Sequence, residues 1–138
     1  MNIKTLAIII LILSPFTIKA QSSEKKITEH LTAITKTDGF RHYQNLPILN
    51  QVADYIHSVF SQYADTTYFQ TYNVNGEIYK NVVCRFGSDI NKPILVAGAH
   101  YDVCGDQEGA DDNASGVVGI LELARMLHGK TLSRPVEL

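Results

Sequence analysis

The stretch PILVAGAHYDVCGDQEGADDNASGVVGILELARML, residues 93–127, decides the fold and holds most of the chemically distinctive residues. Its apolar run, Ile94–Ala97, predicts a central strand that is covered on both faces. A polar loop follows, and apolar residues at helical spacing from Val117 onward predict an amphipathic helix. Because loops at strand ends present side chains while the sheet holds them still, we expect the functional site at this junction.

One histidine and several carboxylates lie in this polar loop. Asp102 follows His100 by two residues, so the two side chains point the same way in an extended chain, and such a carboxylate can fix which ring nitrogen faces a metal. Asp111 lies farther along, and the glycines of the intervening loop allow it to return to the same place. Imidazole and carboxylate groups suit a catalytic zinc. Spacing alone also fits ordinary turn chemistry, with Asp112 or Asn113 capping the helix.

The elements before this stretch predict helices packed on a sheet. Apolar residues recur at helical spacing over residues 22–37 and 45–63. The period changes to two over residues 68–74, and Asn75-Gly76, a strong hairpin signal, leads into strand-like residues 77–86.

Other polar residues and the two cysteines favour structural interpretations. Residues 41–43 form a polar and aromatic segment between the helices, for which we favour a linker held by hydrogen bonds over a substrate contact. His30 lies beside the apolar stripe of the first helix and is predicted to be a partly buried histidine without a ligand role. Cys84 and Cys104 are interpreted as independent thiols, although an oxidising compartment would permit a bridge between them.

The amino terminus has the layout of a secretory signal. Lys4 supplies a positive start, Leu6–Leu13 is unbroken apolar sequence, and Ala20-Gln21 offers a cleavage point. The apolar run is far shorter than the roughly 20 residues that span a bilayer. We therefore expect a signal peptide over residues 1–20, no stable membrane span, and a mature chain from residue 21 that is secreted or periplasmic.

Composition excludes one class of partner. The 138 residues are 45% hydrophobic and carry a net charge of −2. A nucleic-acid-binding protein usually has a strong basic excess, so no nucleic-acid partner is expected.

The motifs GAHYD at residues 98–102 and GADDNASG at residues 109–116, with the helix after them, resemble the co-catalytic dizinc exopeptidases (clan MH). Within that group the chain looks most similar to bacterial leucyl aminopeptidase and aminopeptidase Y, and glutamate carboxypeptidase shares the pattern. The strong match covers roughly residues 79–128, and paired motifs at this separation are specific.

This resemblance implies roles for particular residues. His100 looks like a ligand of one zinc ion and Asp111 like the carboxylate that bridges two zinc ions. Asp102 looks like the catalytic-site carboxylate that orients His100. The peptide bond between Asp111 and Asp112 is expected to be cis, as in relatives.

The implied fold is an α/β three-layer α/β/α sandwich around a mixed central sheet, with its carboxy-terminal part missing from this chain. In relatives a further strand ends in a Glu-Glu pair that supplies the general base and a zinc ligand, and later residues complete the metal site. Residues 133–138 look like the start of that strand, and Glu137 comes too early to be the base. Residues 21–138 are thus expected to be the amino-terminal portion of a zinc peptidase domain, inactive alone.

The preferred interpretation is a secreted zinc metallopeptidase, an exopeptidase and specifically an aminopeptidase, that acts on peptide substrates. A glutaminyl-cyclase-like zinc acyltransferase and a non-catalytic binding ectodomain of the same fold remain alternatives. The sequence does not fix the side-chain preference or the oligomeric state.

Overall fold

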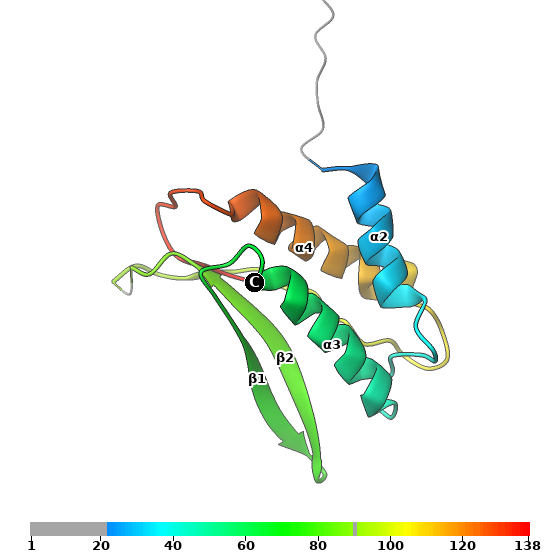
Figure 1. The fold of residues 1–138 in the computed structure, drawn as a ribbon. Coiled ribbons are helices and arrows are strands. Elements are labelled where there is room, and N and C mark those ends of the chain that lie inside the picture. The colour runs from blue at the N-terminus through cyan, green and yellow to red at the C-terminus, as the bar shows by residue number, and fades with distance from the viewer. Residues whose placement is uncertain (1–21, 90) are drawn as a thin grey trace, which may run out of the picture.

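The fold is described from a computed structural model that covers residues 22–89 and 91–138, so the predicted signal peptide and its cleavage point lie outside the described residues. Helices and strands follow one another as expected from the sequence (Figure 1). In chain order they are α2 (Glu24–Thr35), α3 (Leu46–Phe60), β1 (Thr66–Val74), β2 (Glu77–Phe86), β3 (Leu95–Val96), the π-helix η1 (Ala110–Ala114), α4 (Ser115–Leu127) and β4 (Val136–Glu137).

The strands form one mixed sheet in the order β1-β2-β4-β3. The hairpin prediction is confirmed, because Val74 pairs with Glu77 across the turn at Asn75-Gly76, and both turn residues have positive φ. β2 and β4 pair antiparallel, whereas β3 and β4 pair parallel. Parallel neighbours need a long crossover, which α4 provides between β3 and β4.

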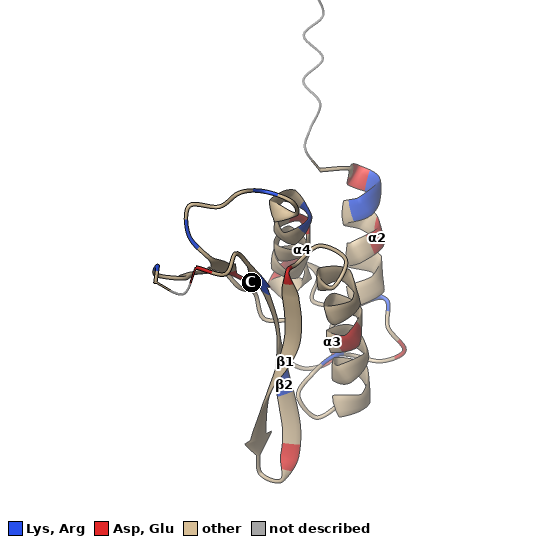
Figure 2. Cartoon of the chain, turned by 60° about the vertical axis from the view of Figure 1, so that its left-hand side comes forward, with Lys and Arg blue, Asp and Glu red and all other residues tan. Residues whose placement is uncertain are grey.

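The described helices lie on one side of the hairpin (Figures 1 and 2). The α/β class with a mixed sheet is therefore confirmed, and the described residues provide two of the three predicted layers. The apolar faces of α3 and α4 meet β2 and β4 in the core, as the helical spacing predicted. The core cluster comprises Ile34, Val52, Ile56, Val59, Phe60, Cys84, Phe86, Ala114, Val117, Val118, Leu121, Ala124, Val136 and Leu138.

The residues that end the chain connect the hairpin to β3. Leu138 exchanges both backbone hydrogen bonds with Cys84 of β2, at 2.9 and 3.0 Å. On its other side this segment accepts hydrogen bonds from β3, with the Leu95 amide donating to the Pro135 carbonyl at 3.0 Å. Without this pairing, β3 would have no place in the sheet of the described residues.

The prediction of a covered central strand at residues 94–97 is wrong for the described residues. β3 contains only Leu95 and Val96, and it lies at the edge of the sheet. Their exposed fractions are 55% and 68%. The apolar run was interpreted as covered on both faces, but the described chain gives β3 a partner on one side only.

Within residues 22–89 and 91–138, none of the helices combines the length and apolarity that crossing a lipid bilayer requires.

The two cysteines are free thiols in different surroundings, as the preferred interpretation predicted. Cys84 is fully buried in the core, and burial raises its pKa to about 12. Cys104 is exposed in the loop after His100.

We expect Ellman's reagent at pH 8 to label Cys104 rapidly in the folded chain. Cys84 should react only after denaturation, because it is buried and its thiolate is scarce at that pH. A Cys104→Ser variant isolates the slow thiol and Cys84→Ser the fast one. Rapid native labelling of Cys104→Ser would contradict the packing described here.

Candidate metal site

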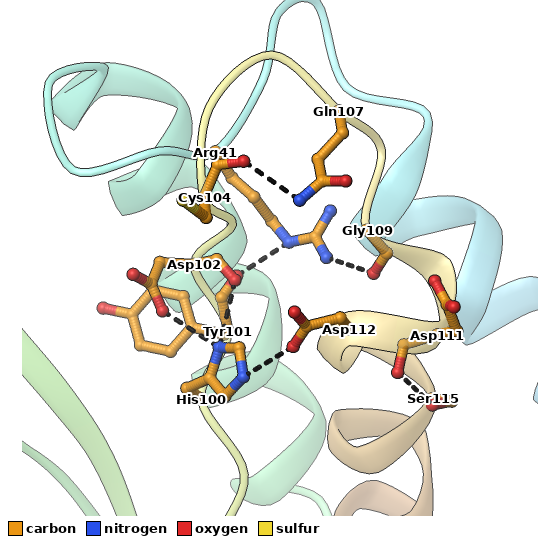
Figure 3. A network of polar contacts seen from close by, with 10 residues as sticks. All are labelled: Arg41, His100, Tyr101, Asp102, Cys104, Gln107, Gly109, Asp111, Asp112 and Ser115. Carbon is orange, nitrogen blue, oxygen red and sulfur yellow. Dashed lines mark hydrogen bonds and ion pairs between the residues drawn. The ribbon is translucent and has the colours of Figure 1, made fainter.

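His100 has one carboxylate at each of its ring nitrogens (Figure 3). Nδ1 lies 3.1 Å from Oδ1 of Asp102, and Nε2 lies 3.0 Å from Oδ1 of Asp112. All three side chains are about half exposed or more, so the group is open to solvent and to a ligand. The predicted pairing of His100 with Asp102 is present in the structure.

Two segments of the chain meet at this group. His100 follows β3 by four residues, and the Ala97 amide still donates to the Glu137 carbonyl, so the sheet holds the start of the segment that carries the imidazole. Asp112 lies in η1, where its φ of −127° and ψ of 87° break the helical path. At this break the Asp112 side chain faces His100, and it does not cap the amino-terminal end of α4. The alternative that Asp112 or Asn113 caps α4 is therefore wrong, since α4 has no side-chain cap.

The structure shifts the expected arrangement of the aspartates by one residue. Asp112 faces His100, whereas the Asp111 side chain points away from it (Figure 3). The Asp111 carbonyl oxygen accepts a hydrogen bond from Ser115 Oγ at 3.3 Å. The cis peptide bond joins Asp112 to Asn113, so the prediction of a cis bond between Asp111 and Asp112 is wrong. Adjacent aspartates are equivalent by residue type, and only the backbone path distinguishes them.

Arg41 holds the two segments of this site together through hydrogen bonds, a role that the sequence analysis did not predict. Its side chain is only 1% exposed, and its hydrogen bonds run to backbone carbonyls of the two segments that carry His100 and Asp112 (Figure 3). The predicted linker held by hydrogen bonds is thereby confirmed. Burial lowers the pKa of Arg41, and the charge of Asp102 opposes this change. The sequence offered one signal for this role, a charged residue just after the end of a helix. It did not indicate the partners in the site, which lie 60 and 68 residues away.

Two glycines permit the close approach of these segments. A Cβ on Gly109, which has φ of +57°, would lie 2.3 Å from Val103 Cγ1 and 2.6 Å from the Asp112 carbonyl oxygen. A Cβ on Gly116 would lie 2.3 Å from Asn113 Oδ1. Both positions fall within the GADDNASG motif, and at Gly109 the positive φ together with the backbone contact requires glycine, whereas at Gly116 the contact is with the Asn113 side chain.

Neighbouring groups complete the surroundings of His100. The Tyr101 hydroxyl donates to the Lys80 carbonyl at 2.5 Å, and burial raises the pKa of Tyr101 to about 12, so it stays protonated. A cavity of about 620 Å³ opens beside the site, with walls from the hairpin, α3 and residues 96–102. Its walls are mainly apolar, with His100 and Asp102 at one side.

Other candidate groups have structural partners. Glu137 forms an ion pair with Arg85 at 2.7 Å, in agreement with its exclusion as the base. His30 Nδ1 lies 2.7 Å from the Tyr55 hydroxyl, and burial lowers its pKa. His30 is therefore the partly buried helical histidine that the sequence predicted.

The imidazole and carboxylate groups at this site are of the kind that binds zinc, but few of them are present. An imidazole nitrogen and a carboxylate oxygen face one another, and a second carboxylate holds the other ring nitrogen, as in carboxylate–histidine–zinc arrangements. Among the residues that the structure describes, no group of three or more His, Cys, Asp or Glu side chains is arranged so that all of them could hold one metal ion. The described residues therefore offer two ligands, His100 and Asp112.

Comparisons with known proteins give one family match and several similar proteins. Residues 81–138 match peptidase family M28. The uncharacterized protein YfbL of Escherichia coli (strain K12) is 36% identical over 125 residues, which cover 85% of this chain and 38% of YfbL. The crystal structure of the Legionella pneumophila LapA aminopeptidase matches with a TM-score of 0.69 and 28% identity, over 83% of this chain and 33% of LapA.

A Tannerella forsythia glutaminyl cyclase shares the fold, with a TM-score of 0.62 and 22% identity over 83% of this chain and 45% of the cyclase. At that identity the likeness shows the fold alone.

The predicted resemblance to the dizinc exopeptidases is therefore confirmed, by the family M28 match over residues 81–138 and by the shared α/β fold of an aminopeptidase. The chain spans little more than a third of the length of YfbL and about a third of LapA.

We expect Gly109→Ala to destabilise the chain much more than Gly105→Ala does. Both glycines have positive φ, but a Cβ on Gly105 meets nothing within 4 Å. Backbone strain alone should cost about 1 kcal/mol at residue 105. At residue 109 the steric overlap with Val103 and the Asp112 carbonyl should add roughly 1–3 kcal/mol. Urea unfolding followed by circular dichroism measures the difference, and equal losses would contradict the close packing at Gly109.

Proposed function

We propose that this chain is part of a secreted or periplasmic zinc-dependent exopeptidase, specifically an aminopeptidase. The observation that carries the proposal is His100 with a carboxylate at each ring nitrogen, at 3.1 and 3.0 Å, on the loop after a strand. The match to family M28 and the likeness to an aminopeptidase structure support it. The secretory layout of residues 1–20 supports the location.

Each residue of the site has a definite task in this proposal. His100 and Asp112 would hold zinc. Asp102 accepts a hydrogen bond from Nδ1–H of His100, which leaves Nε2 as the nitrogen for the metal. When bound, zinc supplies an activated water and polarises a peptide carbonyl. The resemblance implies further ligands and a general base, and this chain spans about a third of the length of the relatives that it matches.

Asp112 replaces Asp111 as the proposed carboxylate ligand. Its Oδ1 lies 3.0 Å from His100 Nε2, the nitrogen left free by Asp102. Metal-ligand atoms from two side chains must converge on one point, and Asp111 points elsewhere (Figure 3). The resemblance implies a second zinc ion, and Asp112 would be among the residues that hold the metals.

The cavity beside His100 supports a peptide substrate. It is mainly apolar, with the polar groups of the site at one side, as is common in pockets that bind organic ligands. A peptide side chain can enter such a space while its backbone stays at the polar edge.

The two alternatives predict different chemistry. A glutaminyl-cyclase-like acyltransferase would share the fold but act on an amino-terminal glutamine, and the likeness to the Tannerella enzyme supports only the fold. A non-catalytic ectodomain would not need His100 with two oriented carboxylates, and their arrangement weighs against it.

Zinc titration of the purified chain by calorimetry tests the proposed ligands. We expect weak binding to the native chain, and loss of most of it in His100→Ala and Asp112→Asn, because each variant removes one of two donors. Asp111→Asn is the matched control and should bind zinc as the native chain does. Native-like binding by both His100→Ala and Asp112→Asn would refute the proposed site.

The chain by itself should not hydrolyse peptides. With two ligands and no identified base, aminoacyl-p-nitroanilide substrates should remain intact with or without added zinc. Release of nitroaniline that requires zinc and His100 would show that the residues described here suffice for catalysis.

A further inference from the structure

The guanidinium of Arg41 connects the two segments that form the candidate metal site. Nε donates to the Tyr101 carbonyl at 2.7 Å, between His100 and Asp102 in sequence. Nη2 donates to the Gly109 carbonyl at 2.7 Å, and Nη1 donates to the Glu108 carbonyl. One side chain therefore binds the backbone on both sides of the gap that separates His100 from Asp112.

The main chain of residue 41 takes part as well. Its carbonyl accepts a hydrogen bond from the Val103 amide at 3.2 Å. Arg41 itself lies between α2 and α3, outside the loop that it holds. The loop from 101 to 109 is thus bound at each end to the buried Arg41 in the segment between α2 and α3.

The chemistry of arginine suits this task. Its planar fork presents five N–H donors in fixed directions, whereas a lysine ammonium presents a compact charge on a flexible stem. Buried carbonyl oxygens need donors, and the fork supplies them to three residues of the loop: Tyr101, Glu108 and Gly109. Gly109 makes the approach possible, because a Cβ there would lie 3.0 Å from Nη2.

An exposed contact at the same loop provides a contrast. Lys36 Nζ pairs with Glu108 Oε1 at 2.6 Å, but both side chains are half exposed or more. Exposed ion pairs contribute little. The buried fork of Arg41 is therefore the contact that can define the loop geometry.

We propose that Arg41 is a positioning residue that sets the separation of His100 and Asp112 by tying together the backbones on either side of them. Its relevance to metal binding rests on the proposed function, whereas its effect on the loop does not. Without the Arg41 guanidinium, the Tyr101 and Gly109 carbonyls lose the hydrogen bonds that they accept from Nε and Nη2 of the same side chain. The two site segments then move independently.

The experiment compares Arg41→Lys, which keeps the charge, with Val59→Ala, which weakens the core away from the site. Amide hydrogen exchange is measured by NMR on the metal-free 138-residue chain. The reporters are the amides of Val103 and Ala114, which donate to the carbonyls of Arg41 and Gly109. We expect their exchange to be about tenfold faster in Arg41→Lys than in Val59→Ala at matched global stability, a local opening that a general loss of stability does not produce.

Zinc titration supplies the second readout. Arg41→Lys should bind zinc roughly tenfold or more weakly than Val59→Ala, by analogy with the loss of groups that orient metal ligands. Equal zinc affinity in the two variants, or equal exchange at both reporters, would overturn the inference.

A third variant guards against misfolding of Arg41→Lys. In Arg41→Ala, millimolar guanidinium should restore slow exchange at Val103 and Ala114, whereas the same concentration of sodium chloride should not. If Arg41→Lys does not fold, absence of restoration by guanidinium in a folded Arg41→Ala would refute the inference. If the native chain binds no zinc through His100 and Asp112, the proposed function fails, and the exchange data alone decide the role of Arg41.

Discussion

The backbone pairing of residues 135–138 is the constraint on which the rest of the described structure depends. This segment bonds to Cys84 of β2 on one side and to the β3 region on the other. Val136 and Leu138 of this segment also belong to the core, and without the segment β3 would have no partner strand in the described sheet. His100 lies four residues after the end of β3, so these hydrogen bonds at the end of the chain fix the start of the segment that carries the imidazole.

The local elements were predictable because their signals are local. Helical spacing gave α2, α3 and α4, and Asn75-Gly76 gave the hairpin with its register. These patterns depend on residues a few positions apart, and burial of one face is enough to enforce them. The position of β3 in the sheet was not predictable, because an apolar run shows that a strand is apolar and does not show which neighbours cover it.

The site was predictable in its chemistry and only partly in its geometry. His100 with Asp102 follows from the alternation of side chains along an extended chain. The choice between Asp111 and Asp112 does not follow from spacing, because it depends on how the backbone turns in η1. Arg41 was beyond reach for a different reason: its partners are backbone carbonyls 60 to 68 residues away, and carbonyls carry no sequence signature.

The exposed position of β3 has a consequence for the chain in solution. Leu95 and Val96 present apolar side chains, and the outer side of a two-residue strand offers backbone donors and acceptors without a partner strand among the described residues. Such an edge is a template on which the backbone of another polypeptide can add as a further strand. The strand that precedes His100 therefore also presents a short open edge, whose two-residue length limits how many backbone hydrogen bonds an added strand could form.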